Sequence, residues 1–370
     1  MPSIMLIYEP MDQLPNNSYY PKSDEVSSYL KQFSGKYSLD YVLKSIEGLS
    51  SLKALVIGEA IIDDYHFGNI LGKSAKEPII ALRYAREESY LGGALAIANH
   101  LAGFCQEVGL LAMLGEKDSQ EKFVRRHLKK NIKPAFVYKE HSPTIVKRRF
   151  LEDSTFRKLL ELYFINSNNL NDRQTKALIK KLKPLLSRYD LVICADFGHG
   201  MFNSYSRDFV SKKAKFLSVN AQANAENFGY HTISSYPRAD LLCLDEREIR
   251  LEHQDKSGDI DDVAKGVFNK IKANYMIVTR GASGSVGYQG NGRRKIFRVP
   301  SLATKDIDRV GAGDAFFAIT SALIYNNVPL EAVCFIGNMV GAIAVSIIGN
   351  KKSVTKKDLV DFIKNTLGQP

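Results

Sequence analysis

The chain has 370 residues, of which 45% are hydrophobic and 25% charged, and its formal net charge is +11. This length and composition predict one large globular domain with an appendage, and no segment approaches the roughly 18 uncharged apolar residues of a membrane span. The Lys and Arg residues are spread along the chain and accompany no groove-reading module, which argues against a nucleic-acid-binding protein and suits a protein whose ligands are phosphates.

The N-terminus and the cysteines indicate the cellular setting. The first residues contain no basic segment followed by a long apolar run, so we expect no secretory signal and a cytoplasmic protein. The four cysteines are far apart in apolar runs, so we expect neither a disulfide nor a zinc site.

Residues 1–50 are rich in Pro, Asn, Ser and Tyr and predict an N-terminal arm or linker. Within it, residues 37–49 are weakly helical, with Ser38 as the cap and Tyr41, Leu43 and Ile46 on one face.

From residue 51 to residue 370 the pattern is that of a single α/β domain. Apolar runs typical of buried strands occupy residues 52–58, 108–114, 191–196, 215–220, 240–244 and 275–281. Helical patterns occupy residues 93–102, 118–130, 172–188, 259–272, 312–325 and 330–348. This alternation predicts a mostly parallel sheet covered by helices on both faces.

Two stretches break the alternation. Residues 66–90 and 142–165 carry strand-like runs with no helix between them. We expect them to pair as a small second sheet that serves as a lid.

The clearest chemical signal is the glycine turn of Gly311, Ala312 and Gly313, followed by Asp314 and an apolar helix. A glycine turn at a helix start exposes backbone N–H groups at the positive end of the helix dipole, where anions bind. A carboxylate one residue later can accept the proton of an attacking hydroxyl while the N–H groups stabilise a transferring phosphoryl group. The alternative is a plain helix N-terminus with Asp314 as a dipole partner.

A second glycine turn follows the predicted strand at 275–281, where Thr279, Gly281 and Gly284 would let a nucleotide approach the backbone closely. Two glycine-containing stretches resemble other phosphate-binding motifs but do not match their spacing. Residues 68–74 have three residues between their glycines where a P-loop has four, and residues 311–316 lack the third glycine of the dinucleotide fingerprint.

Six motifs occur in a recognisable order. They are GEAIIDDY (58–65), the glycine pair 92–93, PTIVKRR (143–149), DFGHG (196–200), TRGASG (279–284) and DRVGAGDAFF (308–317). Together they resemble the ribokinase (PfkB-type) carbohydrate kinase superfamily, and most of all the kinase domain of bacterial heptose 7-phosphate kinases of ADP-heptose synthesis, over roughly residues 52–366. The resemblance implies a ribokinase-like fold with a β lid and an ATP-dependent, magnesium-assisted kinase that phosphorylates a hydroxyl of a sugar or sugar phosphate.

The resemblance also implies roles for single residues. Asp314 is the base, and Gly311, Ala312 and Gly313 form the anion hole. On the acceptor side Asp63 holds sugar hydroxyls. The other acceptor-side residues are Gly92, Gly93, Lys147, Arg149, Asp196, His199, Asn220 and Gln222. The nucleotide-side residues are Thr279, Gly281, Gly284, Asp308 and Asn338, and Asp245 and Glu248 organise magnesium.

Two of these assignments have ordinary alternatives. Lys147 and Arg149 could meet a phosphate on the sugar or belong to a solvated basic edge strand. Asp245 and Glu248 suit a hard cation, but acidic residues also commonly open helices.

The acceptor side departs from the family pattern. Ala96 stands where the family usually has a sugar-binding Asn, His199 replaces a lysine, and Val310 replaces a Thr before the glycine turn. Asn220 and Gln222 replace an Asp and a Lys in an amide-rich segment that also holds Asn224 and Asn227. Such amides are either an ordinary polar loop or the sign of an altered, less charged ligand.

The resemblance implies a homodimer that pairs through the lid and a nucleotidyltransferase that acts next on the product; some relatives carry that enzyme in the same chain. The departures from the family pattern leave two alternative functions open. One is a nucleotide-binding regulatory protein that has lost catalysis, and the other is a kinase of a non-sugar acceptor such as a nucleoside.

Overall fold

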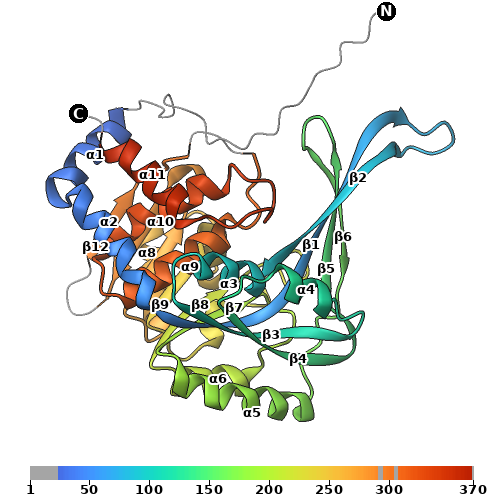
Figure 1. Ribbon diagram of the computed structural model, residues 1–370, viewed down its shortest axis with the longest axis horizontal. Coiled ribbons are helices and arrows are strands. Elements are labelled where there is room, and N and C mark those ends of the chain that lie inside the picture. The colour runs from blue at the N-terminus through green and yellow to red at the C-terminus, as the bar shows by residue number, and fades with distance from the viewer. Residues whose placement is uncertain (1–23, 291–294, 304–306, 369–370) are drawn as a thin grey trace, which may run out of the picture.

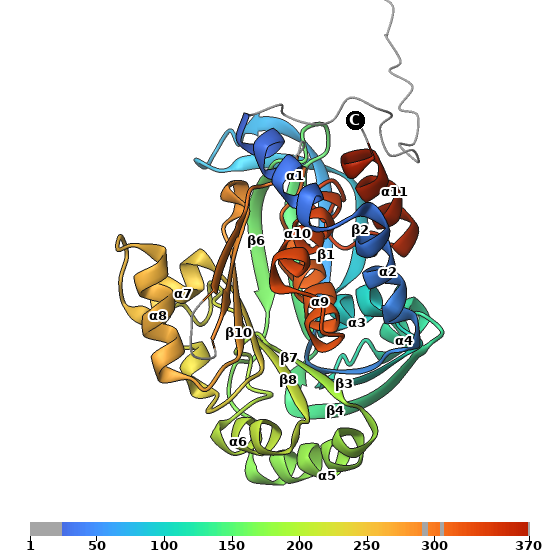
Figure 2. The same ribbon diagram turned by 90° about the vertical axis from the view of Figure 1, so that its left-hand side faces the viewer.

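The computed structural model describes residues 24–290, 295–303 and 307–368, and its centre is a twisted sheet with helices on both faces (Figures 1 and 2). The main sheet has the strand order β12-β11-β10-β9-β8-β7-β1-β3-β4. From β10 to β4 all neighbours are parallel, whereas β11 pairs antiparallel with both β10 and β12. The predicted α/β class and mostly parallel sheet are therefore confirmed.

The described strands are β1 (Lys53–Lys73), β2 (Ile80–Gly93), β3 (Glu107–Lys117), β4 (Ile132–Pro143), β5 (Ile145–Glu152), β6 (Lys158–Phe164), β7 (Leu191–Asp196), β8 (Phe216–Ala221), β9 (Leu241–Asp245), β10 (Tyr275–Thr279), β11 (Ser285–Gln289) and β12 (Lys295–Val299). The described helices are α1 (Asp24–Lys36), α2 (Leu39–Glu47), α3 (Ala94–Ala102), α4 (Glu121–His127), α5 (Asp172–Arg188), α6 (Ser204–Lys213), α7 (Glu246–His253), α8 (Ile260–Lys270), α9 (Ala312–Tyr325), α10 (Leu330–Ala344) and α11 (Lys356–Leu367). Short 3-10 turns span Gly48–Ser51, Ile233–Ser235 and Gly281–Ser283.

The side chains of β1 alternate between two hydrophobic cores, one on each face of the main sheet. Ala54 and Val56 pack with α1, α2, α3, α9, α10 and α11 on one face, whereas Leu55 and Ile57 pack with α5, α6, α7 and α8 on the other. Successive side chains of a strand point to opposite faces, so a run of apolar residues such as this one requires cover on both sides. None of the helices in the described ranges is both long and apolar enough to cross a membrane.

The lid is a second sheet that grows out of β1. The first part of β1 lies in the main sheet, and from Ala60 onward the strand pairs with β2 and, from Ile61, with β5. Strand β6 completes this sheet by pairing antiparallel with β5. The β1–β2 hairpin projects from the body of the molecule (Figure 1). One continuous strand therefore connects the main sheet to this second sheet.

The N-terminal segment packs on the domain through α1 and α2; residues 1–23 of the predicted arm lie outside the described residues. Ser38 caps α2 by accepting a hydrogen bond from the Tyr41 backbone N–H, as predicted. Of the predicted face, Ile46 is buried and Leu43 packs against the core, whereas Tyr41 is 38% exposed and Val42 is buried in its place. Val42 and Ile46, one turn apart, lie on the side of α2 that packs against the core.

Candidate active site

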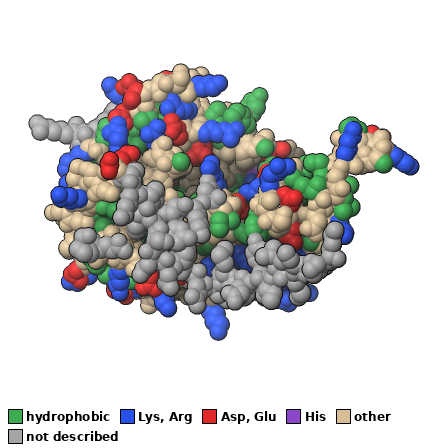
Figure 3. Space-filling view, turned by 90° about the horizontal axis from the view of Figure 1, so that it is seen from above, with side chains coloured by type: hydrophobic (Ala, Val, Ile, Leu, Met, Phe, Trp, Pro, Cys, Tyr) green, Lys and Arg blue, Asp and Glu red, His purple; other side chains and the backbone are tan. Residues whose placement is uncertain are grey.

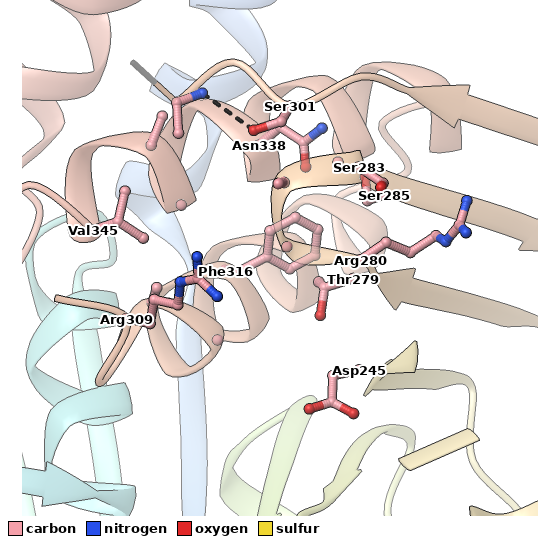
Figure 4. A pocket seen from close by; sticks show the side chains of 18 of the residues that line it. Asp245, Thr279, Arg280, Ser283, Ser285, Ser301, Arg309, Phe316, Asn338 and Val345 are labelled. Carbon is pink, nitrogen blue, oxygen red and sulfur yellow. Dashed lines mark hydrogen bonds between the residues drawn. The ribbon is translucent and has the colours of Figure 1, made fainter. Parts of the chain in front are cut away.

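A cleft of about 1220 Å³ lies where the lid meets the carboxyl ends of the parallel strands. Ligands of open α/β sheets bind at this edge. The cleft is lined from the lid by Asp63 and Lys147, from the ends of β9 and β10 by Asp245 and Thr279, and from the other side by α9, α10 and α1. Figure 4 shows part of it.

The predicted glycine turn opens α9 inside this cleft. Gly311 has φ +79°, a left-handed conformation that favours glycine, and a Cβ there would lie 2.1 Å from Asn350 Oδ1. A Cβ on Gly313 would meet nothing within 4 Å, so the backbone of the turn borders open space. Helix α9 begins at Ala312, whose N–H lies 3.4 Å from the Arg309 carbonyl, and the Ala315 N–H donates to the Gly311 carbonyl at 3.0 Å. The N–H groups of Gly313 and Asp314, between them, have no backbone acceptor among the described residues. These unpaired N–H groups at a helix start could bind an anion, as the sequence predicts.

Asp314 is the third residue of α9 and lines the cleft. Among the described residues its carboxylate has no hydrogen-bond partner. Burial, reinforced by the negative charge of Asp63 and opposed by Lys147, raises the pKa of Asp314 to about 7. A free carboxylate with a near-neutral pKa is well suited to accept a proton.

Asp63 marks the end of the cleft nearest the lid. Its carboxylate accepts hydrogen bonds from Arg149 Nη1 at 2.5 Å and Asn350 Nδ2 at 3.0 Å, and only 4% of the residue is exposed. A Cβ on Gly92 would lie 2.2 Å from Asp63 Oδ2, so glycine leaves room for this carboxylate. Arg149 also donates to Glu161 at 2.8 Å, which balances its charge on both sides.

Lys147 lies beside Asp63 in the register of β1 and β5. It is buried, and its ammonium group lies 5.5 Å from the centre of the Tyr163 ring and 6.0 Å from that of Phe197. Burial lowers the pKa of Lys147, whereas Asp63 opposes this shift. No carboxylate of the described residues lies within ion-pair distance of Lys147. Its charge is therefore available to a ligand anion.

The other end of the cleft holds four predicted nucleotide residues, Thr279, Gly281, Gly284 and Asn338. Gly284 has φ +79°, and a Cβ there would lie 2.0 Å from the carbonyl oxygen of Val299. The Asn338 amide donates to the carbonyls of Val299 and Pro300, at 3.1 and 2.9 Å, so it holds the segment after β12 against α10. This segment and Ser301 form a wall of the cleft (Figure 4).

Asp308 lies behind the cleft wall. It accepts hydrogen bonds from Lys158 Nζ at 2.6 Å, Tyr65 Oη at 3.1 Å and the Gly349 N–H at 2.8 Å. The Lys158 contact joins β6 of the lid to the segment that precedes the glycine turn. Asp308 is thus placed to fix the turn relative to the lid.

Five further predicted residues are absent from the lining. Asp196 is fully buried, and its carboxylate accepts hydrogen bonds from the Arg207 guanidinium at 3.0 Å and the Tyr236 hydroxyl at 2.8 Å. The His199 ring is also buried, and neither nitrogen has a partner in the described structure. Asn220 donates to the Cys243 carbonyl at 2.8 Å. The other two, Gly92 and Glu248, support Asp63 and Asp245 from behind.

The amide-rich segment is mostly occupied with its own fold. The side chains of Asn224 and Asn227 both donate to the Phe197 carbonyl, at 2.7 and 2.8 Å. Of the four amides in this segment, Gln222 alone lines the cleft. The interpretation as an ordinary polar loop therefore accounts for three of the four.

Asp245 and Glu248 form a reciprocal cap at the start of α7. Asp245 Oδ1 accepts from the Glu248 N–H at 2.7 Å, and Glu248 accepts from the N–H groups of Asp245 and Ala223, at 2.8 and 3.0 Å. Burial, with the charge of Asp245, raises the pKa of Glu248 to about 8. Only Asp245 of the pair lines the cleft, and the described residues contain no cluster of three or more metal-ligating side chains.

The sequence interpretation did not identify several cleft residues. Five belong to α1, which no motif marked: Glu25, Val26, Ser28, Tyr29 and Gln32. Others are Ser283, Ser301 and Arg309. Asn350, the partner of Asp63, was missed as well, and its signal was its place in a short Gly-Asn loop after an apolar helix.

Comparison with known proteins gives one family. The profile described as pfkB family carbohydrate kinase matches residues 51–357. The chain is similar to the bifunctional protein HldE of Shewanella sp. (strain ANA-3), with 25% identity over 322 residues that cover 86% of this chain and 65% of that protein. It is also similar to HldE of Actinobacillus succinogenes, with 27% identity over 302 residues that cover 80% and 60%. The chain thus spans less than two thirds of the length of these relatives.

Solved structures share the fold. Phosphofructokinase-2 from Escherichia coli, in a tetrameric inhibited form, superposes with a TM-score of 0.67 at 15% identity, covering 85% of this chain and 99% of that one. Ribokinase from Thermotoga maritima superposes with a TM-score of 0.63 at 17% identity, covering 85% and 99%. The ribokinase-like fold is therefore confirmed.

Proposed function

The chain belongs to the pfkB family of carbohydrate kinases, and from this premise we propose that it transfers the γ-phosphoryl group of ATP to a hydroxyl of a phosphorylated sugar. The sugar kinase class, with an alcohol group as acceptor, follows from the family. The proposal of a phosphorylated acceptor rests on one observation, the buried cation of Lys147 beside Asp63 with no carboxylate partner among the described residues. Heptose 7-phosphate is the first candidate, because of the resemblance to heptose kinases and the similarity to HldE.

The proposed reaction uses groups from both ends of the cleft. Asp63 and Asn350 orient the acceptor sugar, and Lys147 pairs with its phosphate. Asp314 takes the proton of the attacking hydroxyl as its oxygen bonds to the γ-phosphorus and the bond from that phosphorus to the bridging oxygen of ADP breaks. The N–H groups at the start of α9 stabilise charge on the transferring phosphoryl group. The lid excludes water and so limits hydrolysis of ATP.

Magnesium would accompany the nucleotide. Magnesium usually keeps several waters and takes one or two protein carboxylates in addition to phosphate oxygens. Asp245 fits this requirement as a single cleft-lining carboxylate, whereas both oxygens of Glu248 are occupied by backbone N–H groups. The ion would supply charge neutralisation between the phosphates, and Asp245 would hold it from the protein side.

The test is release of ADP over a panel of acceptors. The panel holds sugars, sugar phosphates including heptose 7-phosphate, nucleosides and buffer alone. We expect release that depends on a phosphorylated sugar and is near background with nucleosides. Release only with an unphosphorylated sugar would refute the proposed acceptor class, and the absence of acceptor-dependent release from the whole panel would refute the proposed activity.

Changing Lys147 to Met should raise the KM for a phosphorylated acceptor by ~10-fold or more, because a hydrogen bond to a charged group contributes about 1.5–3 kcal/mol. The KM for ATP should change little. Arg148→Met is the matched control, since Arg148 is the next residue on β5 and pairs with Asp64 at 2.7 Å outside the cleft lining. Equal effects of both changes on the acceptor KM would argue against a phosphate contact at Lys147.

We also propose that two copies of the chain pair through their lids. Strand β6 lies at an edge of the lid sheet and exposes apolar side chains at every second position: Leu160 is 60%, Leu162 45% and Phe164 40% exposed. Apolar side chains are also visible on the projecting lid in Figure 3. An exposed apolar edge strand is a typical surface for pairing with another chain.

This proposal predicts a dimer by light scattering coupled to size-exclusion chromatography. Leu160→Lys combined with Leu162→Lys should convert it to a monomer at micromolar concentration, because two charges would be buried at the pairing edge. Tyr230→Lys, at a residue that is 96% exposed outside the lid, should leave the dimer intact. A monomeric unmodified protein would disprove pairing through the lid.

A further inference from the structure

Helix α1 forms a wall of the cleft although it lies outside the residues that match the family, 51–357. The α1 residues that line the cleft are Glu25, Val26, Ser28, Tyr29 and Gln32. Four of them, at positions 25, 28, 29 and 32, are three or four residues apart and therefore share one face of the helix. The cleft thus includes a surface that the family fold alone does not supply.

The position of α1 is fixed by specific contacts. The Phe33 ring stacks on that of Phe335 in α10 with 4.2 Å between centroids, and Phe33 is 1% exposed. Lys36 forms an ion pair with Glu331 at 3.1 Å. Figure 2 shows α1 lying across α10. The cleft-lining face of α1 is therefore held in place by α10, which itself contributes Asn338 to the same cleft.

Helix α1 lies at the end of the cleft where the proposed reaction places ATP, the phosphate donor. In phosphoryl transfer the attacking and leaving oxygens lie roughly in line, on opposite sides of the transferred group. If Asp63 and Lys147 hold the acceptor on one side of Asp314, the nucleoside must extend to the other side, where Thr279, Asn338 and α1 lie. The α1 residues of the lining include a carboxylate, Glu25, and no Lys or Arg, which suits an uncharged base better than a phosphate.

We propose that α1 binds the base of the nucleotide donor, and that the Gln32 amide and the Ser28 hydroxyl form hydrogen bonds with the polar edge of this base. This inference rests on the proposed kinase function. An amide can both donate to and accept from a base, and a hydroxyl can do either. The two side chains lie together, with Gln32 Nε2 3.5 Å from Ser28 Oγ. Tyr29 completes this wall, and its buried hydroxyl has no hydrogen-bond partner among the described residues. The segment before the family domain would thereby select which nucleotide the kinase uses.

The test measures binding of ADP and of inorganic tripolyphosphate to the full-length protein by calorimetry. Combining Ser28→Ala with Gln32→Ala should weaken ADP binding by ~10-fold, since each hydrogen bond contributes about 0.5–1.5 kcal/mol. Tripolyphosphate has no base, so its affinity should not change. The matched control combines Ser27→Ala with Lys31→Ala, one residue earlier on the same helix and outside the cleft lining, and should bind both ligands as the unmodified protein does.

Each outcome has a defined meaning. Unchanged ADP affinity in the Ser28 and Gln32 variant would overturn the inference, as would an equal loss of ADP and tripolyphosphate binding. If the unmodified protein binds ADP but phosphorylates no sugar, the proposed acceptor fails while the role of α1 remains measurable by binding. If it binds no ADP, both the donor assignment and the inference are wrong.

Discussion

Replacing Asp314 with Asn is expected to lower turnover by at least ~100-fold, the scale of losing a general base. Asn has nearly the same size but cannot accept the proton of the attacking hydroxyl. Because the carboxylate has no hydrogen-bond partner among the described residues, the change should leave the glycine turn and ADP binding intact. Calorimetry with ADP and a phosphotransfer assay separate the two properties.

Asp172→Asn provides the control for this change. Asp172 also lies in the first turn of a helix, α5, but on the surface and away from the cleft. Its replacement should leave turnover unchanged. If Asp314→Asn retained near-normal turnover, the base would be a different group and the mechanism proposed above would be wrong.

The same carboxylate predicts the pH dependence of the reaction. Burial raises the pKa of Asp314 to about 7, and a base acts only when it is deprotonated. The rate at limiting substrate should therefore rise from pH 5 to about pH 7 and level off above it. Lys147→Met removes a cation that favours the charged form of Asp314, so this rise should move to higher pH. A rise at the same pH in both proteins would mean that another group titrates.

The strands and the glycine turn were predictable because their signals are local. Apolar runs such as residues 191–196 are buried on both faces of a parallel sheet and need no knowledge of their neighbours. The turn at Gly311 was recognisable because its glycines and the apolar residues of the helix that follows are adjacent in the sequence. Periodicity and turn chemistry are properties of adjacent residues, whereas the roles given to Asp63 and Lys147 came from the family resemblance alone.

The partners of the site residues were not predictable in the same way. Asn350 reaches Asp63 across 287 positions of sequence, and Lys158 reaches Asp308 across 150. Neither pair leaves a local pattern, because only the folded sheet and lid bring them together. The place of α1 also depends on contacts between helices at opposite ends of the chain, namely Phe33 with Phe335 and Lys36 with Glu331. Asn220 looked like a ligand residue for the same reason, since the carbonyl that binds its amide belongs to the adjacent strand β9.

Glu59→Ala is expected to destabilise the fold more than any other change considered. Glu59 is fully buried at the end of the β1 segment in the main sheet, and it accepts N–H groups from Phe197, His199 and Met201 at 3.0, 3.2 and 3.2 Å. Each buried N–H left without an acceptor costs about 1–3 kcal/mol. A loss of ~3 kcal/mol or more should lower the melting temperature by roughly 5 °C or more in thermal unfolding.

Glu59→Gln separates the loss of acceptors from the loss of charge. Its amide oxygen still accepts, so its destabilisation at pH 7 should be smaller than that of Glu59→Ala. Burial, with the charge of Asp196, raises the folded-state pKa of Glu59 to about 7, above its ordinary value. Its contribution to stability is therefore fully present at low pH and declines as pH rises toward 7, and Glu59→Gln should show a weaker decline over this range. Because Phe197 forms part of the cleft beneath Lys147, Glu59→Ala should also raise the KM for the acceptor. A melting temperature within 2 °C of the unmodified protein, on the ~5 °C scale expected here, would show that the N–H groups of Phe197, His199 and Met201 do not need Glu59 as their acceptor.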